Sequence, residues 1–257
     1  MQRRSSRRTS GPGRPPGSAN SDGRDRLLDT AIDLFAERGI ANTTVAQIAA
    51  AGNVTPGMVH YWFDTREKLL DAVVEERMVP QIRRIWEPAD TERDSAMELV
   101  RGLLARWLEV TAKAPWLPSL WLREIIQEGG MLRERVLDRI PRERNAAFRR
   151  NITRAQERGE INPDISPELL FISIIALVLL PQAVAKHWRR VNPEDMVERA
   201  VLERHVMTLM LHGLSGPAMR GQVDGLLEGV AVKDIEAAHR VVMALRQRVT
   251  RDDGSAD

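Results

Sequence analysis

Residues 43–63, with the sequence TTVAQIAAAGNVTPGMVHYWF, limit the possible folds of this 257-residue chain more than any other stretch. Thr44 is placed to cap a helix, and Gln47 three residues later can complete a capping box with it. Apolar residues then recur at the spacing of one helical face. The stretch therefore begins with a predicted short helix that buries one side.

A tight turn and a second helix follow directly. Gly52 and Asn53 belong to the residue types that most readily enter the left-handed backbone region, so the chain can turn sharply there. Thr55 then caps a new helix, and Pro56 suits its first position. Helix, turn and helix form a helix-turn-helix, whose second helix has the size to enter the DNA major groove. On spacing alone, an ordinary hairpin of two helices explains the pattern equally well.

Characteristic residues also surround this stretch, from Arg26 to Leu70. The preceding helix ends in Leu34-Phe35-Ala36-Glu37-Arg38-Gly39, and the matching positions after it are Thr43-Thr44, Ile48-Ala49, Val54-Thr55-x-Gly57, Phe63 and Leu69. With these features the segment resembles the N-terminal domain of the TetR family of transcriptional regulators. The close resemblance covers roughly a fifth of the chain. Beyond it, the likeness is architectural only.

The resemblance implies an all-α fold with a three-helix helix-turn-helix domain and a larger helical domain for ligand binding and dimerisation. We expect a disordered basic arm over residues 1–22, the DNA-binding domain over 23–70, the ligand-binding and dimerisation domain over 71–215, and an extension with one further helix over 216–257. The implied function is a repressor that binds a palindromic operator in double-stranded DNA as a homodimer. A small apolar ligand would release it.

The reading helix is predicted at about residues 56–62, where side chains near its N-terminus should reach base edges. That face carries no Arg, Asn or Gln, so bidentate readout of guanine or adenine cannot be assigned to it. Two residues depart from the family pattern: Asn53 stands where glycine is usual, and His60 where a phosphate-contacting tyrosine is usual. The expected DNA-binding residues are Arg14, Thr44, Gln47, Thr55, Pro56, Gly57, Met58, His60, Tyr61, Arg66 and Lys68.

Arg66 and Lys68 lie in the first turn of the next helix, which Thr65 is placed to cap. A helix N-terminus with two basic side chains is suited to hold a phosphate. By resemblance, Arg66 takes the place of a lysine that contacts the DNA backbone. The alternative is that both are solvated surface residues.

Positive charge is concentrated at the start of the chain. Residues 1–20 carry five arginines and no acid, whereas residues 21–78 carry six basic residues against ten acidic ones, a net charge of −4. Attraction to DNA must therefore depend on the arm and a few placed residues. The segment Pro12-Gly13-Arg14-Pro15-Pro16 resembles the Gly-Arg-Pro core of minor-groove AT-hook segments. A solvated tail that adds only non-specific attraction is the alternative.

The rest of the chain has the pattern of successive helices, divided by proline and glycine, with no competing strand pattern. A first helix is expected over 24–38, and the helix that starts at residue 66 is expected to continue beyond Pro80 to Trp86. Further helices are expected at roughly 92–113, 116–128, 131–158, 166–187, 194–213 and 233–249.

Large aromatic side chains are frequent in this C-terminal part, where they can line a cavity for an apolar ligand. Glu124 is a polar group that would orient such a ligand. Plain filling of the core is the alternative for each of these residues. The candidate pocket residues are Trp107, Trp116, Trp121, Glu124, Phe148, Phe171 and Trp188.

The predicted helix 166–187 is apolar on all sides, and a helix of that kind must be covered on all sides. A twofold dimer with the helix 194–213 is the commonest way to cover its second face. A central helix buried wholly within one subunit is the alternative. The expected interface residues are Leu170, Ile174, Leu177, Val178, Met207 and Leu211.

Composition excludes several other classes of protein. The absence of cysteine removes disulfides and thiolate chemistry, and it suits a reducing cytoplasm. The run Leu169–Leu180 is shorter than the roughly 20 residues that span a bilayer, so we expect no membrane partner. No phosphate-binding loop, nucleophile elbow or zinc-binding helix motif is found, so we expect no enzyme, cofactor or metal. An architectural DNA-binding protein without a ligand and a helical enzyme that uses the pocket are the competing functions.

Overall fold

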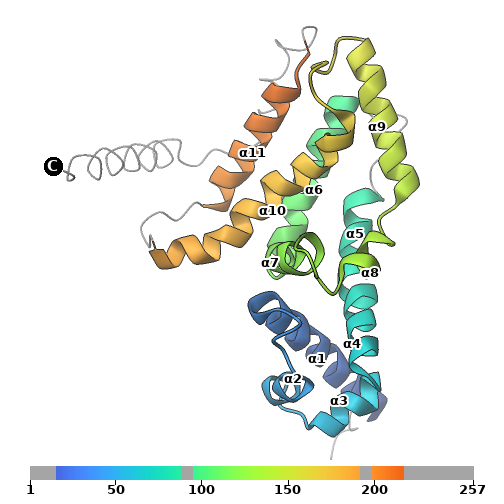
Figure 1. The fold of residues 1–257 in the computed structure, drawn as a ribbon, viewed down its shortest axis with the longest axis vertical. Helices are drawn as coiled ribbons and strands as arrows, with labels where there is room; N and C mark the ends of the chain where they lie inside the picture. Colours follow the sequence, from blue (N-terminus) through green and yellow to red (C-terminus); the bar gives the residue numbers. More distant parts are fainter. Residues whose placement is uncertain (1–15, 88–94, 192–197, 217–257) are drawn as a thin grey trace, which may run out of the picture. The chain divides into compact units, whose positions relative to one another are not determined.

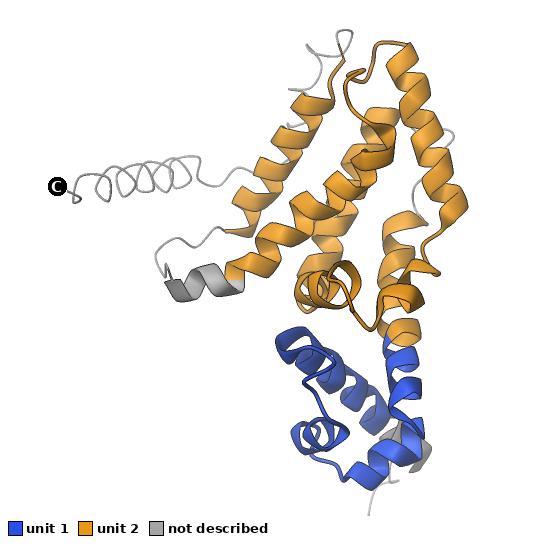
Figure 2. Ribbon diagram, viewed as in Figure 1, with its two compact units in different colours: residues 1–73 blue, residues 74–257 orange. Residues whose placement is uncertain are grey.

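The computed structural model describes residues 16–87, 95–191 and 198–216, with side chains for all of these except 16–21 and 186–191 (Figure 1). Within these ranges, helices alternate with turns and loops, and the one β feature is an isolated antiparallel bridge between Ile161 and Ser215. The predicted all-α fold is thus confirmed for the described part. The chain divides into two compact units between Val73 and Val74 (Figure 2).

The first unit holds four helices in its described part: α1 (Pro16–Arg38), α2 (Val45–Ala51), α3 (Pro56–Phe63) and α4 (Arg66–Val73). The helix-turn-helix pair α2–α3 packs onto α1 and α4. Its core consists of buried apolar side chains from all four helices, among them Leu27, Leu28, Ile32, Phe35, Ile48, Ala49, Val59, Phe63, Leu69 and Leu70.

The two helix starts of the helix-turn-helix form as the sequence predicts. At α2, the Gln47 amide N–H donates to Thr44 Oγ1 over 3.2 Å, and the Thr44 N–H donates to Gln47 Oε1 over 2.8 Å. At α3, the Met58 N–H donates to the hydroxyl of Thr55, which is followed by Pro56 at the first position. Each cap provides an acceptor for an N–H that lacks a partner inside the helix.

We expected that both Gly52 and Asn53, in the turn between these helices, could adopt the left-handed backbone region, but only one of them does. Asn53 does adopt the left-handed region, with φ of 54°. Gly52 has φ of −82°, so it does not need glycine for its backbone conformation. A Cβ at Gly52 would lie only 2.5 Å from Leu27 Cδ1, so glycine allows α2 to approach the core of α1 closely.

Helix α1 begins at Pro16 instead of near Arg24, so residues 16–22 belong to a helix and not to the expected disordered arm. Proline is favourable in the first turn of a helix, where its missing N–H has no partner to lose. Gly23 also lies against α3, because a Cβ there would be 3.2 Å from the Trp62 ring. The helix therefore has a packing contact beyond the apolar stripe that the sequence shows. The rest of the expected arm, including Arg14, lies outside the described residues.

Helices α3 and α4 are joined by a γ-turn centred on Asp64. Asp64 has φ of 60° and ψ of −62°, and the Thr65 N–H donates to the Phe63 carbonyl over 2.6 Å. This conformation is rare and strained for a residue with a side chain. Thr65 then caps α4 as predicted, with the Lys68 N–H donating to its hydroxyl over 3.2 Å.

The helix that starts at Arg66 continues to Trp86, but with a change of helical type. After α4 comes a π-helical turn, η1 (Val74–Met78), and then α5 (Val79–Trp86). Pro80 explains the change, because its ring clashes with the carbonyl four residues before it in a regular α-helix. That carbonyl belongs to Glu76, and the Arg77 guanidinium donates to it over 3.3 Å.

The second unit is built around α6 (Ala96–Lys113), which packs against α5, α9, α10 and α11. The other elements are α7 (Leu117–Trp121), a π-helical turn η2 (Leu122–Ile126), α8 (Arg133–Leu137), α9 (Arg142–Glu157), α10 (Pro167–Val191) and α11 (Arg199–Leu214). Its core includes Val100, Leu103, Leu104, Leu120, Phe148, Ile152, Ile174, Val178 and Leu211.

Two arginines hold the C-terminal end of α5 within this unit. Arg106 of α6 donates through Nε to the Ile85 carbonyl over 2.7 Å. Arg144 of α9 donates to the carbonyls of Trp86 and Glu87. Carbonyls at a helix end lack partners inside the helix, so these cations provide favourable capping contacts.

One predicted helix is in fact two. The stretch 131–158 is interrupted at Pro141, which pushes the preceding residue out of the helical region and itself adopts ψ of 94°. Pro181, in contrast, lies inside α10 without ending it. The predicted helix at 233–249 lies outside the described residues.

Candidate nucleic-acid interface

The N-terminal half of α3 is the exposed surface of the helix-turn-helix. Val59 and Phe63 are buried, whereas Thr55, Pro56, Gly57, His60 and Tyr61 are exposed. Tyr61 shows 72% of its surface to solvent, although it is a large aromatic residue. The predicted reading residues thus share one accessible region, except that Met58 is half-buried.

The side-chain amide of Gln47 on α2 has one group engaged in the helix cap and one group available to a ligand. Its side-chain oxygen accepts from the Thr44 N–H in the capping box. Its NH₂ group remains a donor for an acceptor such as a phosphate oxygen or a purine N7. Both residues are exposed at the start of α2.

His60 has a defined tautomer when it is neutral. Its Nδ1 lies 3.0 Å from the Asp64 carbonyl, which can only accept, so Nδ1 carries the proton. Neutral His60 therefore presents Nε2 as an acceptor, which repels a phosphate oxygen. When the ring is charged, Nε2 also carries a proton and becomes a donor.

Arg66 is half-buried and contributes to the structure of this unit. Its guanidinium donates to the Ile40 carbonyl, in the loop between α1 and α2. A guanidinium has five N–H donors, so this contact leaves capacity for a phosphate. Arg66 therefore connects the start of α4 to the loop between α1 and α2, a function that its sequence position did not indicate.

Lys68 forms an ion pair instead of standing free. Its Nζ lies 2.7 Å from Asp64 Oδ2, and both side chains are more than 60% exposed. The hydrogen bond from Lys68 holds the pKa of the Asp64 carboxyl below its usual value, and the pKa of Lys68 is raised in turn. Because exposed pairs contribute little stability, Lys68 can exchange this carboxylate for a phosphate at small cost.

The predicted pocket aromatics form two separate groups in the second unit. Trp107 and Trp121 meet edge to face, with ring centroids 5.6 Å apart and planes at 87°. Phe148 and Phe171 instead contact Trp86, at centroid distances of 6.5 Å and 4.9 Å. Trp86 was not among the predicted pocket residues, although it ends the apolar stripe of α5 and is 3% exposed.

The other predicted pocket residues lie in different environments. Glu124 is buried, and its carboxylate accepts from the Met131 N–H over 3.2 Å, which closes the loop after η2. In that loop, a Cβ on Gly130 would lie 2.3 Å from the Glu124 carbonyl oxygen, so only glycine fits there. Trp116 is half-buried, and the side chain of Trp188 lies outside the described part.

Most of the predicted interface residues lie in the core of the second unit. Leu170, Ile174, Val178, Met207 and Leu211 are at most 6% exposed, and Leu177 is half-buried. The first five are therefore not available to a partner, and the face assigned to them has to be corrected. The sequence did not distinguish the faces because α10 is apolar on both.

The exposed apolar face of the second unit lies on the opposite side of α10. Leu169, Ile172, Leu180 and Val184 are 41–60% exposed and lie along one side of the helix, and Leu209 of α11 is 51% exposed. We call these five residues the α10–α11 face. Among the described residues nothing covers these side chains, which argues against a helix buried wholly within one subunit.

By length and composition, α10 is able to cross a membrane, which the twelve-residue run in the sequence did not indicate. Its window Pro167–Ala185 has a mean hydropathy of 2.2, and 28% of that window is buried. A single helix of this kind is weak support for a membrane location, since core helices of globular proteins share these properties. In the parts of the chain that the structure describes, no cluster of three potential metal ligands is found.

These features define the class of the N-terminal unit: a helix-turn-helix domain with an exposed reading helix. Residues 27–73 match the model of the family described as bacterial regulatory proteins, tetR family. The N-terminal unit is thus similar to the DNA-binding domain of the TetR family of transcriptional regulators. The HTH-type transcriptional repressor KstR2 of Rhodococcus jostii (strain RHA1) is 25% identical over 200 residues, which cover 78% of this chain and 95% of that protein.

Solved structures of similar fold extend the likeness to the second unit. The ketosteroid transcriptional regulator KstR2 of Mycobacterium tuberculosis has a TM-score of 0.57 at 20% identity, covering 75% of this chain and 94% of that one. The regulator FadR of Bacillus subtilis, solved in complex with stearoyl-CoA, has a TM-score of 0.54 at 20% identity, covering 74% and 98%. At these identities the likeness establishes the fold of the helical C-terminal part.

The contacts of Arg66 and Lys68 predict different effects on stability. Arg66→Ala removes the charge-assisted hydrogen bond to the Ile40 carbonyl and should lower the free energy of unfolding by about 1–2 kcal/mol. Lys68→Ala removes only an exposed ion pair and should leave stability unchanged. Urea denaturation followed by circular dichroism measures both. Equal stability of the two variants would show that the Arg66 contact contributes nothing.

Proposed function

We propose that this chain is a transcriptional repressor that binds a palindromic operator as a homodimer and is released by a small apolar ligand. The observation that carries the proposal is the exposed N-terminal half of α3, supported from below by buried Val59 and Phe63 and capped by Thr55. A short helix fixed in this way can enter the major groove without rearranging. The family of the N-terminal domain supports the same conclusion.

Phosphate contacts would come from several side chains around this helix. Tyr61 and the NH₂ group of Gln47 provide neutral donors, and Lys68 and Arg66 provide charge. These contacts position the protein but do not read sequence. Base preference would then depend on Pro56, Gly57 and Met58, together with the shape and deformability of the operator.

The homodimer is supported by the α10–α11 face. An apolar stripe of this length is unfavourable in water and has the form of an interface between helices. A twofold dimer would carry two reading helices, which must meet successive major grooves about 34–36 Å apart. We place the protein in the cytoplasm, where both DNA and the effector are available to it.

Release would follow from a ligand that prefers the dimer with a different spacing of its reading helices. The ligand lowers DNA affinity only by its difference in affinity for the two forms. A coupling of about 1–3 kcal/mol weakens DNA binding roughly 5–150-fold. The apolar second unit, with its two groups of aromatic residues, supports a ligand with a large apolar part, and stearoyl-CoA on FadR is an example from a protein of similar fold.

The function is tested by selecting bound fragments from a random DNA pool with the full chain and with two variants of Gly57. A Cβ at Gly57 has no contact closer than 3.7 Å, so larger residues fit there without disturbing the fold. Gly57→Glu places a negative charge on the reading helix and should abolish binding. Gly57→Gln has the same size without the charge and should retain part of the affinity.

We expect the selected fragments to share a palindromic sequence. Binding without sequence preference, with a steep dependence on salt, would instead indicate an architectural DNA-binding protein. DNA binding by Gly57→Glu as tight as by the unchanged chain would show that α3 does not enter the groove. No DNA binding together with turnover of a bound metabolite would indicate an enzyme.

The dimer is tested by placing a charge on the α10–α11 face. Ile172→Glu and Leu180→Glu should weaken dimerisation by about 3 kcal/mol, or roughly 100-fold, because the carboxylate would be buried without a partner. Leu137→Glu is the matched control, since Leu137 is 45% exposed but lies on α8. Sedimentation equilibrium measures the dissociation constant. An intact dimer, or binding of the unchanged chain to lipid vesicles without self-association, would contradict the assignment.

A further inference from the structure

Two buried hydrogen-bond donors in the second unit have no partner among the described residues. The indole nitrogens of Trp107 and Trp121 are shielded from solvent and form no hydrogen bond there. The side chains are 2% and 3% exposed. A buried donor without an acceptor is unfavourable, so folded proteins rarely retain two such groups side by side.

The edge-to-face arrangement of the two rings does not provide partners for both. In such a pair one ring presents its edge to the face of the other, so at most one N–H can point at a π system. At least one indole N–H therefore still needs an acceptor.

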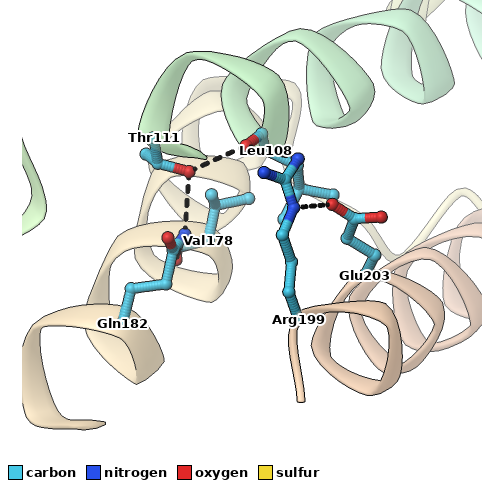
Figure 3. Close-up of polar contacts among 6 residues, drawn as sticks. All are labelled: Leu108, Thr111, Val178, Gln182, Arg199 and Glu203. Carbon is cyan, nitrogen blue, oxygen red and sulfur yellow. Dashed lines mark hydrogen bonds and ion pairs between the residues drawn. The ribbon is translucent and has the colours of Figure 1, made fainter. Parts of the chain in front are cut away.

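A neighbouring polar group on the same side of α6, the Thr111 hydroxyl, does have partners. Thr111 lies one turn after Trp107, and its hydroxyl donates to the Leu108 carbonyl over 3.0 Å. The same hydroxyl accepts from Gln182 of α10 over 3.0 Å, and Gln182 also donates to the Val178 carbonyl over 2.8 Å (Figure 3). The contacts between α6 and α10 thus give partners to their polar groups, while Trp107 and Trp121 have none in the described structure.

We propose that Trp107 and Trp121 bind the effector through a neutral hydrogen-bond acceptor, such as the carbonyl of a ketone, ester or thioester. This inference rests on the proposed function in that a small molecule enters the second unit. Indole N–H groups only donate, so they select an acceptor. The rest of the ligand is apolar, because α6, α7 and α10 contribute mainly apolar side chains where they pack together.

A carboxylate fits this position less well than a neutral carbonyl. The buried ionisable side chain in the described residues is Glu124, which follows Trp121 by about one helical turn and is itself an acid. A second carboxylate buried beside it would place two like charges close together, which is unfavourable. The geometry therefore favours an uncharged acceptor.

The test uses three probes of similar size: acetophenone, ethylbenzene and benzoate. Acetophenone has a neutral carbonyl, ethylbenzene has no acceptor, and benzoate carries a charge. The full chain, labelled with ¹⁵N at the tryptophan indoles, is titrated with each probe, and the indole signals are followed by NMR. Trp107→Phe and Trp121→Phe assign the signals and remove the donors while keeping an aromatic ring. Trp86→Phe is the matched control in the other aromatic group.

Acetophenone should shift the signal of at least one of these two indoles downfield, and ethylbenzene should not. The affinity for acetophenone should fall roughly fivefold to tenfold in the variant that loses the donor, with ethylbenzene unaffected. Benzoate should bind more weakly than acetophenone, and Trp86→Phe should preserve the preference for the ketone. The signals of the unchanged chain keep the test decisive if a variant fails to fold.

The inference is overturned if acetophenone shifts neither signal, or if its advantage over ethylbenzene survives both substitutions. An upfield indole proton that responds to no probe would show that the partner ring is its acceptor. DNA binding measured in parallel separates the two proposals. Loss of operator binding with a ketone-sensitive indole signal would contradict only the repressor function, and normal operator binding with insensitive indoles would contradict only the inference about the ligand.

Discussion

The packing of α2 and α3 onto α1 and α4 is the constraint on which a DNA-binding function depends. Helices of seven and eight residues are too short to be stable alone in water. They persist because Ile48, Val59 and Phe63 are buried and because Thr44 and Thr55 satisfy their first N–H groups. The position of the reading surface therefore depends on the core beneath it. An exposed side chain such as Tyr61 is positioned by buried residues that would not contact DNA themselves.

Electrostatics in the first unit does not resemble that of a strongly basic DNA-binding protein. The guanidinium of Arg66 bonds to a carbonyl, Lys68 is paired with Asp64, and Arg24 lies 4.9 Å from the centre of the Phe63 ring. Acidic residues outnumber basic ones over residues 21–78. Under the proposed function, DNA competes with internal partners for these cations, so affinity should respond to salt and to few side chains.

Local features could be predicted from the sequence, whereas features that depend on distant contacts could not. The caps at Thr44 and Thr55 and the left-handed Asn53 follow from neighbouring residues, and all are present. The exposed side of α10 could not be predicted, because Leu170 and Leu169 are chemically alike and differ only in what packs against them. The close approach of Gly23 to Trp62 and the buried indoles also arise only when separate helices meet.

The γ-turn at Asp64 has a mechanical consequence for the helices on either side. A connection with one residue at its centre cannot lengthen, and its positive φ is already far from the preferred backbone regions. The His60 ring and the Lys68 ammonium both bind Asp64, one through its carbonyl and one through its carboxylate. The end of α3 and the beginning of α4 are therefore rigidly connected. A displacement of the first turn of α4 would move the reading helix with it, because the short connection cannot change its length.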